Sequence, residues 1–211
     1  MTKTQAGKPS RTRLDPDTVV RAALELLDEK GAEAVSIRAI AERLGVRMNT
    51  VLWHAKTKAR LLELMADAIV AEMSLEDLPE PCEERVRELS HRYRRALLAH
   101  RDGATIVAGT YAAEPATLRF ADTMVETLLS SGLAEREAAW VLWTVVYFTL
   151  GLTQEEQASP EAVGHGLTGA LASGEYPSLG RVVAHLEAPT FAERFDYGLS
   201  LILQSLGSHR V

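Results

Sequence analysis

Apolar residues recur at every third or fourth position along most of this chain, which is the pattern of amphipathic α-helices. In the first third, Val19, Ala23 and Leu27 share one stripe of a helix expected over 16–29. Residues able to cap a helix precede such runs, and glycines follow them. Four short helices are therefore predicted over 16–29, 37–44, 46–53 and from Thr57 to about residue 73.

The rest of the chain keeps the helical spacing and holds no convincing strand, so the predicted fold class is all-α. Helices are expected over 83–99, 103–110, 115–131, 134–157 and 191–207. Five glycines and three prolines between 158 and 190 predict loops that hold a weak helix or two. The longest apolar run, Ala138 to Leu152, is shorter than the roughly 18 residues that a membrane helix needs.

Proline and acidic residues mark the most prominent break in the pattern. The segment 75–82 (LEDLPEPC) contains two prolines and three acids, which is typical of a loop between domains. The sequence thus predicts a helical head over 15–73 and a helical body over 83–211. Residues 1–14 are polar and basic, and we expect them to form a disordered arm.

Charge is distributed unevenly between head and body. Residues 1–60 hold 12 Lys and Arg against 7 Asp and Glu, whereas the remaining residues hold 11 against 22, for a net charge of -6. A basic head on an acidic body suits a nucleic-acid-binding protein. An asymmetry of charge that has no function would produce the same distribution, so both interpretations remain open. The sequence has one cysteine, Cys82, which we interpret as an incidental free thiol; a single cysteine excludes an intramolecular disulfide and a CxxC zinc site. Because the sequence also shows no secretory leader, we expect a cytoplasmic protein.

The strongest motif runs from Ile37 to His54 and has the spacing of a helix-turn-helix. Ala41 is small enough for two helices to cross, and Gly45 allows the tight turn. Apolar residues at 40, 44, 46 and 51 would pin both helices to a common core. The exposed side of the second helix would then carry Arg47, Met48, Asn49, Thr50 and His54. Arginine can recognise guanine and asparagine can recognise adenine in the major groove of DNA.

Two lysines flank the predicted start of the next helix. Lys56 and Lys58 stand on either side of Thr57, where cations oppose the helix dipole. A DNA phosphate bound there would reverse that balance, because backbone N–H groups and lysines would act together. Two exposed lysines with no such role would cost little, so the motif supports phosphate contact without requiring it.

At this point the motifs resemble those of the tetracycline-repressor (TetR) family. In the head they are AALELL from residue 22, SIRAIA from residue 36 and VLWH with KTK from residues 51 to 58. In the body they are RRALL and RDGA between 94 and 104, and FTLG from residue 148. The resemblance implies a homodimer whose helices 134–157 and 191–207 form a four-helix bundle with their symmetry mates. It also implies a palindromic operator, read by two recognition helices about 34–36 Å apart.

The resemblance places a set of residues at or beside DNA-contacting positions. These are Arg38, Arg47, Met48, Asn49, Thr50, Trp53, His54, Lys56 and Lys58. Leu52 departs from the family pattern, which has a hydroxyl-bearing tyrosine before the tryptophan or arginine. The operator sequence therefore cannot be inferred from the family.

The resemblance also implies a pocket for a small-molecule inducer in the body. The metal-binding histidine of the family falls at Val107, which has no lone pair for a metal, while its acidic partner falls at Glu155. Positions that make polar drug contacts in the family are occupied here by Met73, Leu89 and Met124. Each of these residues could either line the pocket or pack in the ordinary core, and the sequence leaves both interpretations open. Tyr93, Trp143 and Tyr147 could supply aromatic walls to the pocket. The competing interpretation places Trp143, and also Trp140, in the core or in the dimer interface. We expect no metal, no cofactor and an inducer that is not magnesium-tetracycline.

These patterns together predict a ligand-responsive transcriptional repressor. Ligand would shift the fourth helix and so change the spacing of the two heads. The alternative is a helical adaptor that binds another protein and not DNA. An enzyme is not expected, since no nucleophile with a nearby base, converging carboxylate pair or phosphate-binding loop is present. His91, His100, His165 and His185 show no metal-ligand spacing.

Overall fold

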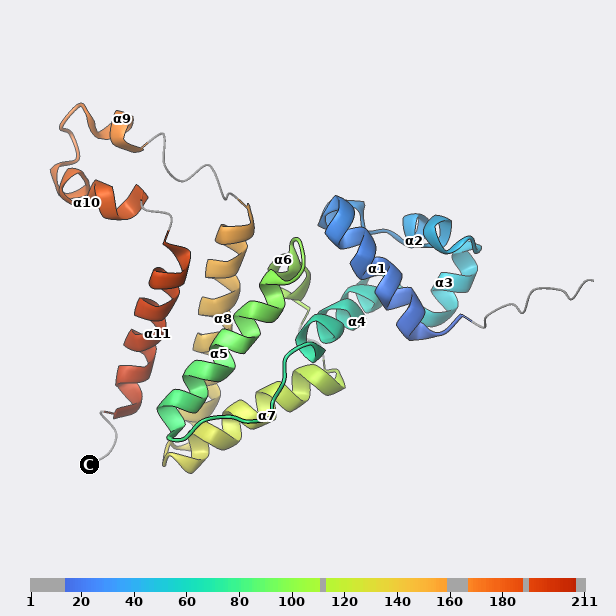
Figure 1. Ribbon diagram of the computed structural model, residues 1–211, viewed down its shortest axis with the longest axis horizontal. Helices are drawn as coiled ribbons and strands as arrows, with labels where there is room; N and C mark the ends of the chain where they lie inside the picture. Colours follow the sequence, from blue (N-terminus) through green and yellow to red (C-terminus); the bar gives the residue numbers. More distant parts are fainter. Residues whose placement is uncertain (1–13, 111–112, 159–166, 188–189, 208–211) are drawn as a thin grey trace, which may run out of the picture.

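The computed structural model describes residues 14–110, 113–158, 167–187 and 190–207, and within them it consists of helices without a strand (Figure 1). The prediction of an all-α fold is confirmed. None of the helices described there is long and apolar enough to cross a membrane. The arm predicted over 1–14 lies, apart from Leu14, outside the described residues.

Four helices and one 3-10 turn make up the head. They are α1 (Pro16–Lys30), the turn Ala32–Ala34, α2 (Ile37–Leu44), α3 (Met48–Ala55) and α4 (Lys58–Ala71). The side chains of Asp15, Ser36 and Thr57 cap α1, α2 and α4 by accepting backbone N–H bonds of 2.7, 3.2 and 3.0 Å. The helix expected over 46–53 starts two residues later, because the backbone of Arg47 is extended and serves as the N-cap.

Within its described residues the body consists of α5 (Cys82–Leu98), α6 (Gly103–Val107), α7 (Pro115–Ser130), α8 (Glu135–Ala158), α9 (Leu167–Leu171), α10 (Pro177–Glu187) and α11 (Phe191–Gly207). The prediction that the second of them reaches residue 110 is wrong. It ends at Val107, since Ala108 is extended and Gly109 has a φ of 77°. The glycine-rich stretch holds two short helices, α9 and α10, which pack on each other near one end of α11 (Figure 1).

One continuous apolar core extends from head to body, and α4 carries it across. Leu61 and Met65 of α4 are fully buried with residues of α1 and α3, while the same helix packs against α6 and α7 (Figure 1). The domain boundary predicted at 75–82 therefore stays a prediction, because the core is continuous between head and body. What the structure does determine is that any movement of α4 involves both head and body.

Candidate DNA-binding surface and effector cavity

The α2–turn–α3 unit has the geometry that the sequence predicts. Gly45 adopts the left-handed conformation, with φ 63° and ψ 30°, and the N–H of Val46 donates to the carbonyl of Ala41 at 3.0 Å. Ile40 and Val51 are fully buried against each other's helices and α1. The two helices are thus fixed at a wide angle by a tight turn and a shared core.

The outer side of this unit carries all nine predicted DNA-contacting residues. Seven of them are exposed, and Thr50 and His54 are half-buried. Trp53 is 74% exposed and Met48 is 46% exposed, which is unusual for large apolar side chains on a small head. The Lys56 ammonium lies 5.0 Å from the centre of the Trp53 ring. A surface that combines apolar side chains with cations suits duplex DNA, because the cations can contact the phosphates and the apolar side chains can contact methyl groups in the major groove.

Two of these cations stand at the start of α4. Lys56 ends α3 with a φ of 61°, and Lys58 is the first residue of α4. Both are exposed on either side of the Thr57 cap. Arg38, by contrast, is paired with Glu42 on α2 at 2.9 Å, so any DNA contact by Arg38 exchanges a surface ion pair for a phosphate or base.

A cavity of about 600 Å³ opens in the body between α4, α5, α6, α7 and α8. Four residues predicted for the ligand site line it, namely Tyr93, Val107, Trp143 and Tyr147. The other walls are mostly small or apolar and include Ala66 and Val70 of α4. A ligand in this cavity would therefore touch α4, the helix that continues into the head.

The walls of the cavity are aromatic, with few polar groups. Tyr93 stacks on Phe120 at 4.9 Å between ring centres, and Trp143 stacks on Tyr147 at 5.3 Å. Among the described residues that line the cavity there is no acid, base or histidine, and the polar side chains are those of Tyr93, Tyr147, Trp143, Thr110, Thr117 and Gln154. Tyr93 is nearly fully buried, and this burial raises the pKa of its hydroxyl, which therefore stays protonated and able to donate.

The remaining predicted ligand residues lie elsewhere. Leu89 and Met124 are fully buried in the hydrophobic core and do not line the cavity, which agrees with the packing interpretation left open above. Met73 lies at the edge of a second, more open cavity of about 440 Å³, and Glu155 is exposed on α8. Within the described residues there is no group of three His, Cys, Asp or Glu side chains placed to hold a metal ion.

Sequence reasoning missed most of the wall residues, among them Phe120 and Gln154. A signal for Gln154 was present, because residues 143, 147, 150 and 154 follow one stripe of α8, and the first two had been identified. Phe120 had no such signal, since it comes from α7 and meets Tyr93 only in the folded chain.

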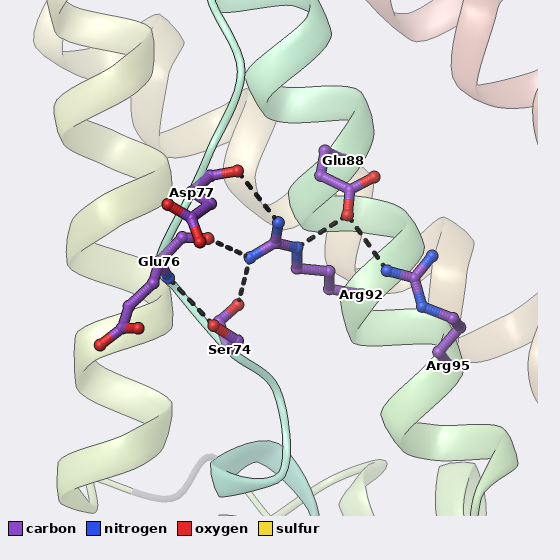
Figure 2. Close-up of polar contacts among 6 residues, drawn as sticks. All are labelled: Ser74, Glu76, Asp77, Glu88, Arg92 and Arg95. Atoms are coloured by element: carbon purple, nitrogen blue, oxygen red, sulfur yellow. Dashed lines mark hydrogen bonds and ion pairs between the residues drawn. The ribbon is translucent and has the colours of Figure 1, made fainter.

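The second cavity borders a polar cluster that holds the segment between α4 and α5 (Figure 2). The Arg92 guanidinium donates to the backbone carbonyls of Ser74, Glu76 and Asp77 at 2.9, 2.6 and 3.3 Å, and to the Glu88 carboxylate at 2.7 Å. Hydrogen bonds from Arg92, and more weakly from Arg95, hold the pKa of Glu88 below its usual value. This arrangement anchors the far end of α4 to α5.

Comparison with known proteins places the whole chain among bacterial regulators. Residues 19–65 match the family described as bacterial regulatory proteins, tetR family, and residues 77–209 match the tetracyclin repressor-like C-terminal domain. The chain is 34% identical to the class A tetracycline repressor of transposon 1721 from Escherichia coli, over 95% of this chain and 94% of that protein.

Two solved structures from Streptomyces coelicolor share the fold. One is a possible TetR family transcriptional regulator, with 36% identity, a TM-score of 0.83 and coverage of 93% of this chain and all of that one. The other is the TetR family protein ActR in complex with (S)-DNPA, with 26% identity, a TM-score of 0.83 and coverage of 93% and 98%. The second structure holds a small molecule in a chain of the same architecture.

Proposed function

Because the chain belongs to the TetR family of transcriptional regulators, we propose that it represses transcription as a homodimer on a palindromic operator and is released by an uncharged aromatic small molecule. The family consists of ligand-responsive DNA-binding repressors without enzymatic activity, which favours this function over the protein-binding adaptor. A regulator of this kind acts where the chromosome is, in agreement with the predicted cytoplasmic location.

The operator contacts proposed here divide into two kinds. Arg47, Met48, Asn49 and Thr50, at the start of α3, would reach base edges in the major groove. Trp53, His54, Lys56, Lys58 and Arg38 would contact the backbone and fix the orientation of the head. The observation that supports this division is the exposure of Met48 and Trp53 beside exposed cationic side chains.

Dimerisation would use the outer faces of α8 and α11. Trp140 and Tyr197, on these two helices, are 57% and 69% exposed, and Leu201 is half exposed. Apolar surface of this size costs free energy in water and is normally covered by a partner. A second copy of the same chain would cover it in a four-helix bundle and would set the distance between the two heads.

The inducer is proposed from the chemistry of the 600 Å³ cavity. Stacked aromatic pairs and small apolar walls suit a flat, largely apolar ring system. Tyr93, Thr110 and Gln154 offer hydrogen bonds to a few carbonyl or hydroxyl groups on such a ligand. A magnesium-tetracycline chelate does not suit it, because Val107 stands where an imidazole ligand is needed and none of the described wall residues carries a charge.

One observation carries the proposal: the cavity is lined by α4, which also packs inside the DNA-binding head. A ligand that fits the cavity differently in two positions of α4 would shift the equilibrium between them, and hence the geometry of the two heads. Ligand and operator would then oppose each other reciprocally.

The first test is selection of binding sites from random duplex DNA with the purified full-length protein. Wild type should enrich a palindrome, and the double variant Asn49→Ala, Thr50→Ala should lose it. Asp122→Ala, an exposed change on α7 and outside α2 and α3, serves as the matched control and should enrich the same palindrome. A folded wild-type dimer that enriches no sequence at low salt would contradict the proposal.

A further inference from the structure

The turn between α5 and α6 docks on the end of α1 and so joins the body to the head. The backbone N–H of Ala32 donates to the Asp102 carboxylate at 2.8 Å, and the N–H of Arg101 donates to the Asp28 carboxylate at 3.1 Å. The Arg101 guanidinium also donates to the carbonyl of Glu29 at 3.4 Å. The orientation of the head is thus set directly at this turn as well as through α4.

His100 lies at the centre of this junction and bridges three helices. It is only 8% exposed. Its Nδ1 lies 3.0 Å from Asp28 Oδ2 on α1, and its Nε2 lies 3.0 Å from Glu72 Oε1 at the end of α4. The ring itself belongs to the end of α5, so one imidazole connects two segments of the head to the body.

This geometry requires a proton on both ring nitrogens. A neutral imidazole has one N–H, and ionised carboxylates can only accept hydrogen bonds, so a neutral ring would satisfy one partner and repel the other. Burial of the ring lowers the pKa of His100, but the hydrogen bonds that the ring donates to the Glu72 and Asp28 carboxylates outweigh burial, and the net effect is a pKa above the usual value.

The other charged groups at the junction are already engaged with different partners. Arg101 binds a backbone carbonyl, the Asp102 carboxylate accepts from Ala32, and Glu29 is paired with Arg43 on α2. Among the described residues, His100 is the cation that the structure pairs with Asp28 and Glu72. Loss of its proton would therefore leave two carboxylates facing a single N–H.

The turn that carries His100 is fastened on its other side to a wall of the effector cavity. Gln157 of α8 donates to the carbonyls of Leu97 and His100 at 3.0 and 2.8 Å, and accepts from the N–H of Ala104 at 3.0 Å. Ala104 lies in α6, which ends at the cavity residue Val107. One short segment thus links cavity wall, junction and head.

We propose that His100 is a positioning residue that holds the head on the body only while both of its ring nitrogens carry a proton. This proposal rests on the proposed function in one respect, namely that the head it positions binds DNA. Because the folded-state pKa is raised, the stabilisation is complete below the unfolded value of about 6.5 and is lost as pH rises through the folded value. The head is therefore held more loosely in alkaline solution.

The test uses the full-length protein and needs neither DNA nor inducer. Imidazole resonances and amide hydrogen-exchange protection factors at the end of α1 are measured by NMR from about pH 5.5 to about pH 9. We expect His100 to titrate above 6.5 and protection at residues 27–32 to fall through the same pH range. In His100→Gln, protection should be lower and without this pH step. His91→Gln, which removes another histidine that the structure pairs with a carboxylate, should keep the wild-type profile.

A second variant keeps the proposal falsifiable if His100→Gln folds poorly. The amide introduced by Glu72→Gln can donate to an unprotonated ring nitrogen, so the bridge no longer needs a charged ring. The titration of His100 and the step in protection should then both shift to lower pH. A wild-type His100 that titrates at or below 6.5, or a step that persists in His100→Gln, would overturn the proposal. A failed DNA selection would leave these measurements unaffected, so the two failures are distinguishable.

Discussion

Gly198 of α11 faces the ring of Phe148 on α8 so closely that a Cβ atom at Gly198 would lie 2.3 Å from the ring. Phe148 in turn stacks on Phe195 at 5.6 Å between ring centres. The close approach of α8 and α11, the two helices proposed to form the dimer, therefore depends on the absence of a side chain at this position.

Gly198→Ala should destabilise the protein although alanine is the better helix former. Displacement of Phe148 costs about 1–3 kcal/mol, against a gain in helix propensity of up to about 1 kcal/mol. Urea denaturation at one fixed protein concentration measures the net loss. Gly180→Ala is the matched control, because a Cβ there meets nothing within 4 Å and the change should be neutral or stabilising. A Gly198→Ala protein as stable as wild type would show that this approach does not constrain the helices.

Lys58→Gln should weaken DNA binding to specific and random duplexes alike. A contact between a lysine and a phosphate carries no sequence information, and its loss lowers the slope of log affinity against log salt by about 1. Fluorescence anisotropy at several salt concentrations gives this slope. Lys30→Gln, at the end of α1 and away from α3, should leave the slope as in wild type. If both variants behave alike, the effect of Lys58 reflects overall charge.

Magnesium-tetracycline should not bind the cavity, whereas flat uncharged aromatic compounds should. Tryptophan fluorescence is a direct readout, since Trp143 lines the cavity. For a bound compound with a carbonyl group, Tyr93→Phe should weaken binding by about 0.5–1.5 kcal/mol through loss of one hydrogen bond. Compounds without an acceptor should bind both proteins equally. Saturable quenching by magnesium-tetracycline at micromolar concentration would contradict the assignment of the cavity.

The ion pair between Arg60 of α4 and Glu114 at the start of α7 should contribute to stability in a pH-dependent way. Their charged atoms are 2.5 Å apart, and the hydrogen bond from Arg60 holds the pKa of Glu114 below its usual value. The contribution is therefore present above about pH 4.5 and is lost as pH falls through the lower, folded-state value. Glu114→Gln should lose less than about 1 kcal/mol at neutral pH, because Arg60 is partly exposed to solvent.

Denaturation of wild type and Glu114→Gln at several pH values measures this contribution, and their stabilities should converge in acid. Glu126→Gln, an exposed change on the same helix, is the control and should show no such convergence. A difference that stays constant down to acid pH would mean that the glutamate acts through packing and not through its charge.

Local signals in the sequence were sufficient for the helices of the head. Asp15, Ser36 and Thr57 act within three residues along the chain, and Gly45 acts at its own position, so capping and turn formation can be recognised without knowledge of the fold. The surface of α3 follows from the same logic, because helical periodicity separates the buried Val51 from the exposed Asn49 and Trp53. The end of α6 was missed because the expected helix ran on to residue 110 through Gly109, which has a φ of 77° and follows an extended Ala108.

Only the tertiary structure decided which residues meet across large sequence separations. Leu89 and Met124 have the same apolar character as the cavity residues Val107 and Leu142, yet packing places the first pair in the core and the second pair on the wall. His100 has no informative neighbours in the sequence and gained its role from Asp28 and Glu72, which are 72 and 28 residues away. Periodicity and capping depend on neighbouring residues and are written in the chain itself, whereas a cavity wall or a bridging histidine depends on how whole helices pack.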